Sequence, residues 1–207
     1  MLINHPVSPA EAEIPRNAAA ATPPHRWRFA TVGAEIRPAV ESFIAAGFLK
    51  AYDAHLTEFM PELVVLHDHG ELAAACGLRP AAASPLFLEQ YLDLPVEHAL
   101  AACGAERHTI IEIGNLSIAR PGYARHLVCG LTRLLHERGM RWALFSAVPA
   151  LRNNFRRLGI PMTDLGPADP ARLPATVRAN WGSYYLQQPQ VTAVQVATAF
   201  AALGGQP

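Results

Sequence analysis

Hydrophobic residues recur at two different spacings in the middle of the chain. Residues 109–118 alternate apolar residues with small or polar ones around several isoleucines, which predicts a β-strand. Over residues 123–138 the apolar residues recur every three or four positions, which predicts a helix, and Gly139 stands where a glycine commonly ends one. A second strand at 142–146 and a helix that begins at Pro149 follow. The predicted order is strand, turn, helix, strand, helix.

The turn between the first strand and its helix is a candidate binding site for an anion. Gly122 lies in this turn, and Tyr123 and Ala124 begin the predicted helix. A glycine turn at a helix N-terminus directs backbone N–H groups and the positive end of the helix dipole at one place. Arg120 and Arg125 flank that place, so we expect it to hold a pyrophosphate or the phosphate of phosphopantetheine. The alternative is an ordinary strand-to-helix connection whose turn needs a glycine.

The same patterns predict the remaining elements, and they indicate a mixed α/β fold in which helices flank one sheet. The chain after Gly159 contains four prolines up to residue 174 and is expected to be irregular there. The other expected elements are a strand at 27–32, a helix from Pro38 to Tyr52, a β-hairpin with arms at 63–66 and 72–79, an extended arm at 86–92, a short helix at 96–103 and an amphipathic helix at 191–203.

Composition narrows the class of protein. The 207 residues suffice for one domain, which we expect over 26–207, after a disordered, proline-rich leader at 1–25 that lacks the pattern of a secretory signal. The 17 basic residues balance the 17 acidic ones, which argues against a nucleic-acid partner. Three scattered cysteines fit a reducing compartment and a cytoplasmic protein. His67 and His69 lack a third ligand placed by motif, so no metal is expected.

Several motifs make the chain resemble known families. The segment Ala119-Arg-Pro-Gly122-Tyr-Ala124 is similar to the pyrophosphate loop of the GNAT acyltransferase superfamily, although alanine replaces the leading glutamine or arginine. From about Phe29 to Leu203 the chain resembles the thermostable hemolysin family, whose name describes a phenotype and not a chemistry. The segments that carry this second resemblance are Gly77-Leu-Arg-Pro80, Leu86-Phe-Leu-Glu-Gln-Tyr-Leu-Asp93, Glu112-Ile-Gly-Asn-Leu116, Ala119-Arg-Pro-Gly122, Leu151-Arg-Asn-Asn-Phe155 and Trp181-Gly-Ser-Tyr-Tyr185.

The chain is also similar to the acyl-homoserine-lactone synthases, which share the GNAT fold. Arg79 precedes a proline and Glu112 lies on the strand before the loop, as the corresponding residues do in those enzymes. Asn115 stands where those enzymes have a second arginine, which argues against S-adenosylmethionine as the acceptor. The resemblance implies an acyl-CoA or acyl carrier protein donor and a small amine acceptor.

Acyl transfer from a thioester to an amine needs a stabilised oxyanion, a base for the ammonium and a proton for the thiolate. In the GNAT fold a splayed strand offers N–H groups to the thioester, and we expect Gly114 to Leu116 of the strand 109–118 to do so. A bulge or a close backbone approach is expected at Gly114. Glu112 is the expected base. The alternative for Glu112 is an ion pair with Arg107 or Arg79.

Other candidates surround these residues. Glu89 lies in an apolar run and needs a partner or a function. We expect Arg79 as that partner, the pair holding the acceptor's amine and carboxylate or serving only as a structural ion pair. Tyr91 and Ser146 are candidate proton donors, and Arg152 belongs to a basic helix face for phosphates or an acidic carrier protein.

The sequence thus favours an N-acyltransferase that uses acyl-CoA or acyl carrier protein, has no tightly bound cofactor and acylates a small molecule such as an amino acid. The alternatives are a membrane-active protein, which needs an exposed amphipathic element at 36–50 or 191–203, and a GNAT-like binding module without activity. Contact with a membrane and a homodimer stay open.

Overall fold

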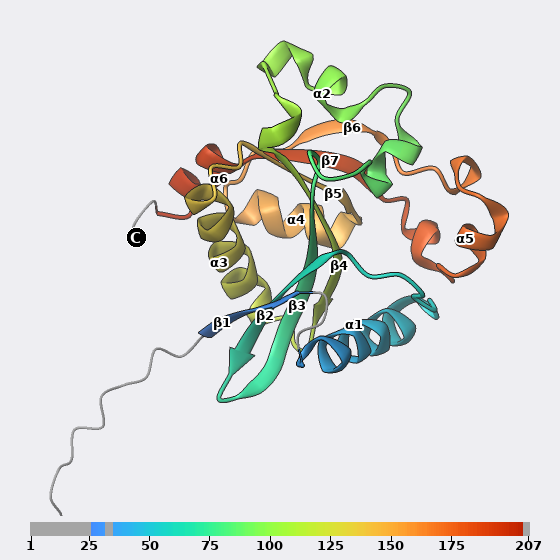
Figure 1. Ribbon diagram of the computed structural model, residues 1–207, viewed down its shortest axis with the longest axis vertical. Coiled ribbons are helices and arrows are strands. Elements are labelled where there is room, and N and C mark those ends of the chain that lie inside the picture. Colours follow the sequence, from blue (N-terminus) through green and yellow to red (C-terminus); the bar gives the residue numbers. More distant parts are fainter. Residues whose placement is uncertain (1–25, 32–34, 205–207) are drawn as a thin grey trace, which may run out of the picture.

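A seven-stranded sheet forms the centre of the molecule (Figure 1). The computed structural model describes residues 26–31 and 35–204, and the leader expected at 1–25 lies outside them. The strand order is β1-β2-β3-β4-β5-β7-β6, and every neighbouring pair is antiparallel except β4 and β5. The strands are β1 (Arg26–Thr31), β2 (Glu62–Asp68), β3 (Glu71–Pro80), β4 (Ile110–Ile118), β5 (Trp142–Ala147), β6 (Thr163–Pro167) and β7 (Gln190–Gln195).

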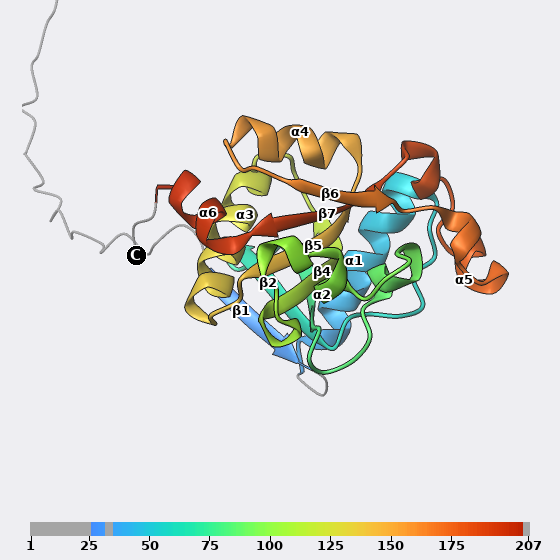
Figure 2. The ribbon, with the colours of Figure 1, turned by 90° about the horizontal axis from the view of Figure 1, so that it is seen from above.

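Helices cover both faces of the sheet (Figures 1 and 2). Alternate residues of a strand point to opposite faces, so Leu63 and Val65 of β2 pack with α1, whereas Val64 and Leu66 pack with α3. We call these the α1 face and the α3 face. The helices are α1 (Arg37–Tyr52), α2 (Val96–Ala99), α3 (Tyr123–Glu137), α4 (Pro149–Arg157), α5 (Ala175–Ala179) and α6 (Val196–Ala202); the 3₁₀-helices are η1 (Phe87–Tyr91), η2 (Ala101–Cys103), η3 (Arg107–Thr109), η4 (Pro170–Arg172) and η5 (Tyr184–Gln187).

The predicted unit from β4 to α4 is confirmed, as are the first strand, the helix α1 and the hairpin of β2 and β3. Three expectations are wrong. Residues 86–92 form the 3₁₀-helix η1 instead of an extended arm. Residues 191–203 are not one helix, because their first part is the strand β7, buried between β5 and β6, and only α6 follows as a helix. The strand β6, at the edge of the sheet, lies in the segment that was expected to be irregular.

The strands β4 and β5 separate soon after they begin. Their parallel pairing runs from Ile110 opposite Trp142 to Glu112 opposite Leu144, whereas β4 continues to Ile118 and β5 to Ala147. The amides that follow Glu112 on the β5 side of β4 therefore lie outside this ladder. The gap opens in the middle of the sheet, in front of the N-terminus of α3.

Within the described residues, no helix combines the length and the apolar character that crossing a membrane requires. The buried side chains of α1 are Val40, Ile44 and Phe48, which pack on β2 and β3. The apolar stripe of this helix is therefore part of the core.

The α1 face is closed by an aromatic cluster that depends on one glycine. Trp181 packs against Phe48 of α1, and Tyr184 packs edge-on against Tyr52. Gly182, between them, has a φ of +49°, and a Cβ added there would lie 2.2 Å from the carbonyl oxygen of Tyr52. Only glycine fits both this backbone conformation and this contact.

We therefore expect Gly182→Ala to lower the free energy of unfolding by about 2–5 kcal/mol, because a left-handed alanine is strained and its Cβ meets backbone. Urea unfolding followed by tryptophan fluorescence measures this change. The matched control is Gly104→Ala, because Gly104 also has a positive φ (+59°) but an added Cβ meets no atom within 4 Å. That variant should lose only about 1–2 kcal/mol. Equal losses in the two variants would contradict the close packing at Gly182.

Candidate active site

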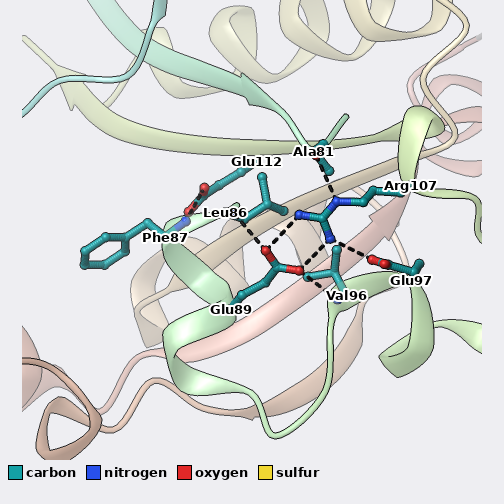
Figure 3. Close-up of polar contacts among 8 residues, drawn as sticks. All are labelled: Ala81, Leu86, Phe87, Glu89, Val96, Glu97, Arg107 and Glu112. Carbon is teal, nitrogen blue, oxygen red and sulfur yellow. Dashed lines mark hydrogen bonds and ion pairs between the residues drawn. The ribbon is translucent and has the colours of Figure 1, made fainter. Parts of the chain in front are cut away.

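Glu112 is the buried carboxylate at the point where β4 and β5 separate. Its exposed fraction is 1%, and it lies on the α1 face of β4. One oxygen accepts a hydrogen bond from the amide of Phe87 at 2.8 Å (Figure 3). The other accepts from the amide of Leu88 at 3.1 Å, and these two residues begin η1. The first amides of a helix have no partner within it, so the carboxylate and the helix end satisfy each other.

The charge of Glu112 is only partly compensated. Burial raises the pKa of its carboxyl group, whereas the Phe87 amide, Arg79 and the Leu88 amide lower it, and the result is a pKa of about 7. Of the two partners that the sequence offered, Arg79 is the one at the carboxylate, with Nη1 3.9 Å from Oε2. The Arg79 side chain is 23% exposed and makes no other ion pair in the described part of the chain. A carboxylate with such a pKa can take up or release a proton near neutral pH.

Glu89 has a different partner from the one expected. It does not pair with Arg79; instead its oxygens accept from Nη1 of Arg107 at 2.7 Å and from Nη2 at 2.9 Å. The amides of Leu86 and Val96 also donate to it (Figure 3). The hydrogen bond from Arg107 is the largest cause that lowers its pKa, to about 2. Glu89 is thus a fixed anion that joins η1 to the start of α2.

Two glycines leave a flat patch beside Glu112 on the same face. Arg79 of β3 is opposite Glu112, and Gly77 is opposite Gly114 in the same register. The pairing then shifts by one residue, because Asn115 has a φ of +49° and forms a bulge in β4. The bulge expected at Gly114 thus lies one residue further along, and a Cβ added at Gly114 would lie 2.4 Å from the methyl carbon of the Met60 side chain.

Hydroxyl groups line the other side of the gap. Ser146, near the end of β5, is half-buried, and its Oγ lies 2.8 Å from the hydroxyl of Tyr184. The hydroxyl of Tyr91 is hydrogen-bonded to that of Tyr185. Burial raises the pKa of Tyr184 and that of Tyr91 above the ordinary range, so both hydroxyls stay protonated.

The turn before α3 has the features of an anion site. Gly122 is exposed and has helical backbone angles, and a Cβ added there would meet no atom within 4 Å. The exposed Arg120 and Arg125 form no ion pair with another described residue. The hydroxyl of Tyr123 donates to Asp68 at 2.7 Å, which fixes this turn to the β2–β3 hairpin. Ala124 follows in the first turn of α3.

Arg152 and Leu116 lie away from the α1 face. Arg152 donates two hydrogen bonds to Asp164 of β6, at 2.6 and 2.7 Å, so its guanidinium is already engaged. Leu116 packs with the core of the α3 face. The described residues contain no group of His, Cys, Asp and Glu side chains that could hold a metal ion.

A small apolar cavity of about 30 Å³ lies on the α3 face under the gap. Ile113 of β4 and Phe145 of β5 line it from the sheet, and Val128 of α3 and Phe155 of α4 line it from the helices. It is therefore on the face opposite to Glu112 and Arg79. Sequence analysis did not find this cavity, Met60 or the η1 amides, because each results from contacts between distant segments.

Comparisons with known proteins agree with this fold. The model of a family described as thermostable hemolysin matches residues 30–200. Among solved structures, the acyl-homoserine-lactone synthase LasI has a TM-score of 0.58 at 13% identity, over 87% of this chain and 95% of its own. FeeM, an N-acyl amino acid synthase from uncultured soil microbes, has a TM-score of 0.59 at 15% identity, over 88% and 96%. The comparison with curated protein sequences finds no significant match.

These structural relatives have low sequence identity, so they establish the fold. A CoA-dependent acyl-homoserine-lactone synthase, MesI, also matches, with a TM-score of 0.51 at 15% identity over 88% of this chain and 97% of its own. The fold expected from the sequence, a GNAT-like mixed sheet flanked by helices, is thereby confirmed.

The environment of Glu112 predicts a pH dependence of stability. Its pKa is about 7 in the folded protein and near 4.5 in the unfolded chain, so the folded state binds more protons between these values. This contribution to stability is complete below about pH 4.5 and is lost as the pH rises to 7. We expect the loss to be about 3 kcal/mol and to disappear in Glu112→Gln, as measured by urea unfolding from pH 4.5 to 8.

Glu89→Gln is the control for this measurement. The pKa of Glu89 is lowered to about 2, so its contribution to stability is present above about pH 4.5 and is lost only as the pH falls toward 2. The charge of Glu89 is the smallest of the causes that shift the pKa of Glu112, so this variant should keep most of the wild-type slope between pH 4.5 and 7. A wild-type slope in Glu112→Gln would assign the effect to another group.

Proposed function

We propose that this chain, which belongs to the thermostable hemolysin family, is an N-acyltransferase that moves an acyl group from a CoA or carrier-protein thioester to the amine of a small molecule such as an amino acid. The observation that carries the proposal is the gap between β4 and β5, with a buried carboxylate of raised pKa at its closed end. Both reactants of an acyl transfer have a complementary surface around this gap.

The donor would enter from the turn before α3. The amides and arginines of that turn suit a phosphate group, and α3 begins directly after the strand that borders the gap. A pantetheine chain whose phosphate lies at Gly122 can therefore run along β4. Its carbonyl oxygen would accept hydrogen bonds from β4 amides that the ladder with β5 leaves free.

The acyl chain would lie on the α3 face. Every residue that lines the cavity under the gap is apolar except Thr132, as suits a hydrocarbon chain, and the cavity is small. A longer chain therefore needs the side chains of α3 and α4 to move apart. The cavity supports an apolar acyl group and leaves its length open.

The acceptor would lie on the α1 face. The guanidinium of Arg79 has donors free for a carboxylate, and Glu112 can take the proton that the ammonium must lose. The amine nitrogen then forms a bond to the thioester carbon, and the carbon–sulfur bond breaks. The nitrogen loses its second proton, which passes through solvent or through the hydroxyl pair of Ser146 and Tyr184 to the leaving thiolate. Asn115 would contribute through its backbone conformation, because its positive φ forms the bulge in β4.

A membrane-active function is less well supported. That alternative depends on an exposed amphipathic helix at 36–50 or at 191–203. The stripe of α1 is buried, and residues 191–203 do not form one helix. A binding module without activity stays an outcome of the experiment below, in which it would bind CoA without turnover.

The experiment incubates purified protein with acyl-CoA and a panel of amino acids and detects free thiol and the amide product. We expect turnover in the wild type. In Gly122→Ala we expect a rise of at least about tenfold in the dissociation constant of CoA, equivalent to ~1.4 kcal/mol, because the new methyl group occupies the space of the phosphate. Since Gly122 has helical angles and an open surround, the unfolding free energy should not fall.

Arg133→Ala is the control for the anion site. Arg133 lies on the same helix, where it pairs with Glu137 and is remote from the turn. This variant should bind CoA as the wild type does, whereas Arg120→Ala should bind it more weakly. Unchanged CoA binding in both Gly122→Ala and Arg120→Ala would contradict the placement of the phosphate.

A second prediction concerns the acyl chain. Val128→Phe adds volume to the wall of the apolar cavity, so we expect it to favour shorter acyl-CoA substrates by about tenfold or more in kcat/KM. The measurement compares acyl chains of two to twelve carbons. Leu134→Phe is the matched control, because Leu134 lies on the same helix outside the cavity lining. A similar chain-length profile in both variants would place the acyl chain elsewhere.

A further inference from the structure

The two glycines beside Glu112 are required by the limited space around them and not by their backbone conformation. Gly77 and Gly114 face each other across β3 and β4, on the same face as Arg79 and Glu112. Neither glycine has a positive φ, so the backbone alone would accept other residues at both positions. At Gly114 the side chain of Met60 alone excludes them, and at Gly77 the side chains of Met60 and Asn115 do so together.

Met60 occupies the space that the two glycines leave. A Cβ added at Gly77 would lie 2.6 Å from Cβ of Met60, and one added at Gly114 would lie 2.4 Å from its methyl carbon. The side chain therefore lies across both strands, from β3 to β4, and Met60 is only 7% exposed. The glycine pair that it covers is two residues along each strand from the Glu112–Arg79 pair, a distance of about 7 Å.

The backbone of Met60 is held by hydrogen bonds, whereas its buried side chain makes only van der Waals contacts with the two glycines. Oδ1 of Asn115 accepts from the Met60 amide at 2.9 Å, and the Met60 carbonyl accepts from Nη2 of Arg37 at 2.9 Å. Arg37 also donates to the carbonyl of Pro61 at 3.0 Å. The chain at Met60 is thus fixed to the β4 bulge on one side and to α1 on the other. An unbranched thioether side chain on such an anchor can change its rotamer without moving the backbone.

We propose that Met60 forms the movable wall of the acceptor pocket and sets the size of the amine that can lie beside Glu112 and Arg79. This inference rests on the proposed acyl transfer, because it assigns the α1 face to the acceptor. The acyl cavity is on the other face, so Met60 selects the amine and not the acyl chain. A small amine fits beside the resting side chain, whereas a larger one must displace it from the glycines.

The first experiment compares amino acids from glycine to tryptophan as acceptors, with one acyl-CoA. Met60→Ala removes the wall, and we expect it to raise kcat/KM for the largest acceptors relative to glycine by about tenfold or more. Met60→Leu has a similar volume and is the matched control; its ranking of acceptors should stay within about threefold of the wild type. Assays are run well below the unfolding temperature of each variant, so that lost stability does not affect the ranking.

The second experiment does not need turnover. The chain has four methionines, and ¹³C-methyl labelling gives each one a signal; the signal of Met60 is the one that Met60→Leu removes. We expect large amino acids, added without an acyl donor, to shift this signal and leave those of Met140 and Met162 unchanged. Arg79→Ala should weaken the response, because it removes the partner of the acceptor's carboxylate.

The outcomes separate this inference from the proposed function. A responsive methyl signal with an altered acceptor ranking supports both. A responsive signal without turnover in any variant keeps Met60 in an amine site and refutes acyl transfer. A signal that no amino acid shifts overturns the role of Met60, whether or not turnover occurs, and so does an unchanged ranking in an active Met60→Ala enzyme.

Discussion

The early end of the β4–β5 ladder is the constraint from which the site follows. Both strands are paired on their other sides over most of their length, β4 with β3 up to Ile118 and β5 with β7 from Trp142 to Ala147. Beyond Glu112, β4 stays paired with β3 and β5 stays paired with β7, and the bulge at Asn115 bends β4. Only three residue pairs join them. Unpaired backbone groups inside a sheet need other partners, and in the proposed reaction the thioester of the donor is that partner.

Two carboxylates near η1, at the closed end of the gap, have pKa values that are shifted in opposite directions. Glu112 and Glu89 each accept two backbone hydrogen bonds at or near η1. Glu89 also has the guanidinium of Arg107 at 2.7 Å, whereas that of Arg79 is 3.9 Å from Glu112. Burial therefore dominates at Glu112 and raises its pKa, and the partner dominates at Glu89 and lowers its pKa. Glu89 therefore stays ionised as part of the structure, whereas Glu112 can bind or release a proton near neutral pH.

Local patterns predicted the part of the fold that local forces determine. The unit from β4 to α4 follows from hydrophobic spacing, a glycine turn and first-turn proline chemistry, and it appears as expected. The helix predicted at 191–203 is wrong in its first half, because a run of valine and alanine suits a buried strand as well as a helix. Burial between β5 and β6 makes this half a strand. The segment 86–92 misled because its helical turn is stabilised by Glu112, a residue far along the chain.

The residues of the candidate site also divide into those that local sequence patterns predict and those that only the tertiary structure reveals. Glu112, Gly114 and the turn at Gly122 could be found from the sequence because one strand and its following turn hold them together. The partner of Glu89 could not, because Arg79 and Arg107 are both plausible by sequence and only the tertiary structure brings Arg107 to it. Met60 gave no signal, because a methionine before a proline has no pattern that distinguishes it from other core residues.

In the proposed acyl transfer, the raised pKa of Glu112 and its burial would serve the same chemistry. A carboxylate with its ordinary pKa would be a weak base toward an ammonium group, whereas one with a pKa of about 7 is a stronger base and is still ionised in half of the molecules at that pH. The burial that raises the pKa comes from η1, which also covers the α1 side of the gap. A dry gap disfavours hydrolysis of a thioester, because water must compete with a bound amine. The segment that makes Glu112 a better base would thus also protect the acyl group.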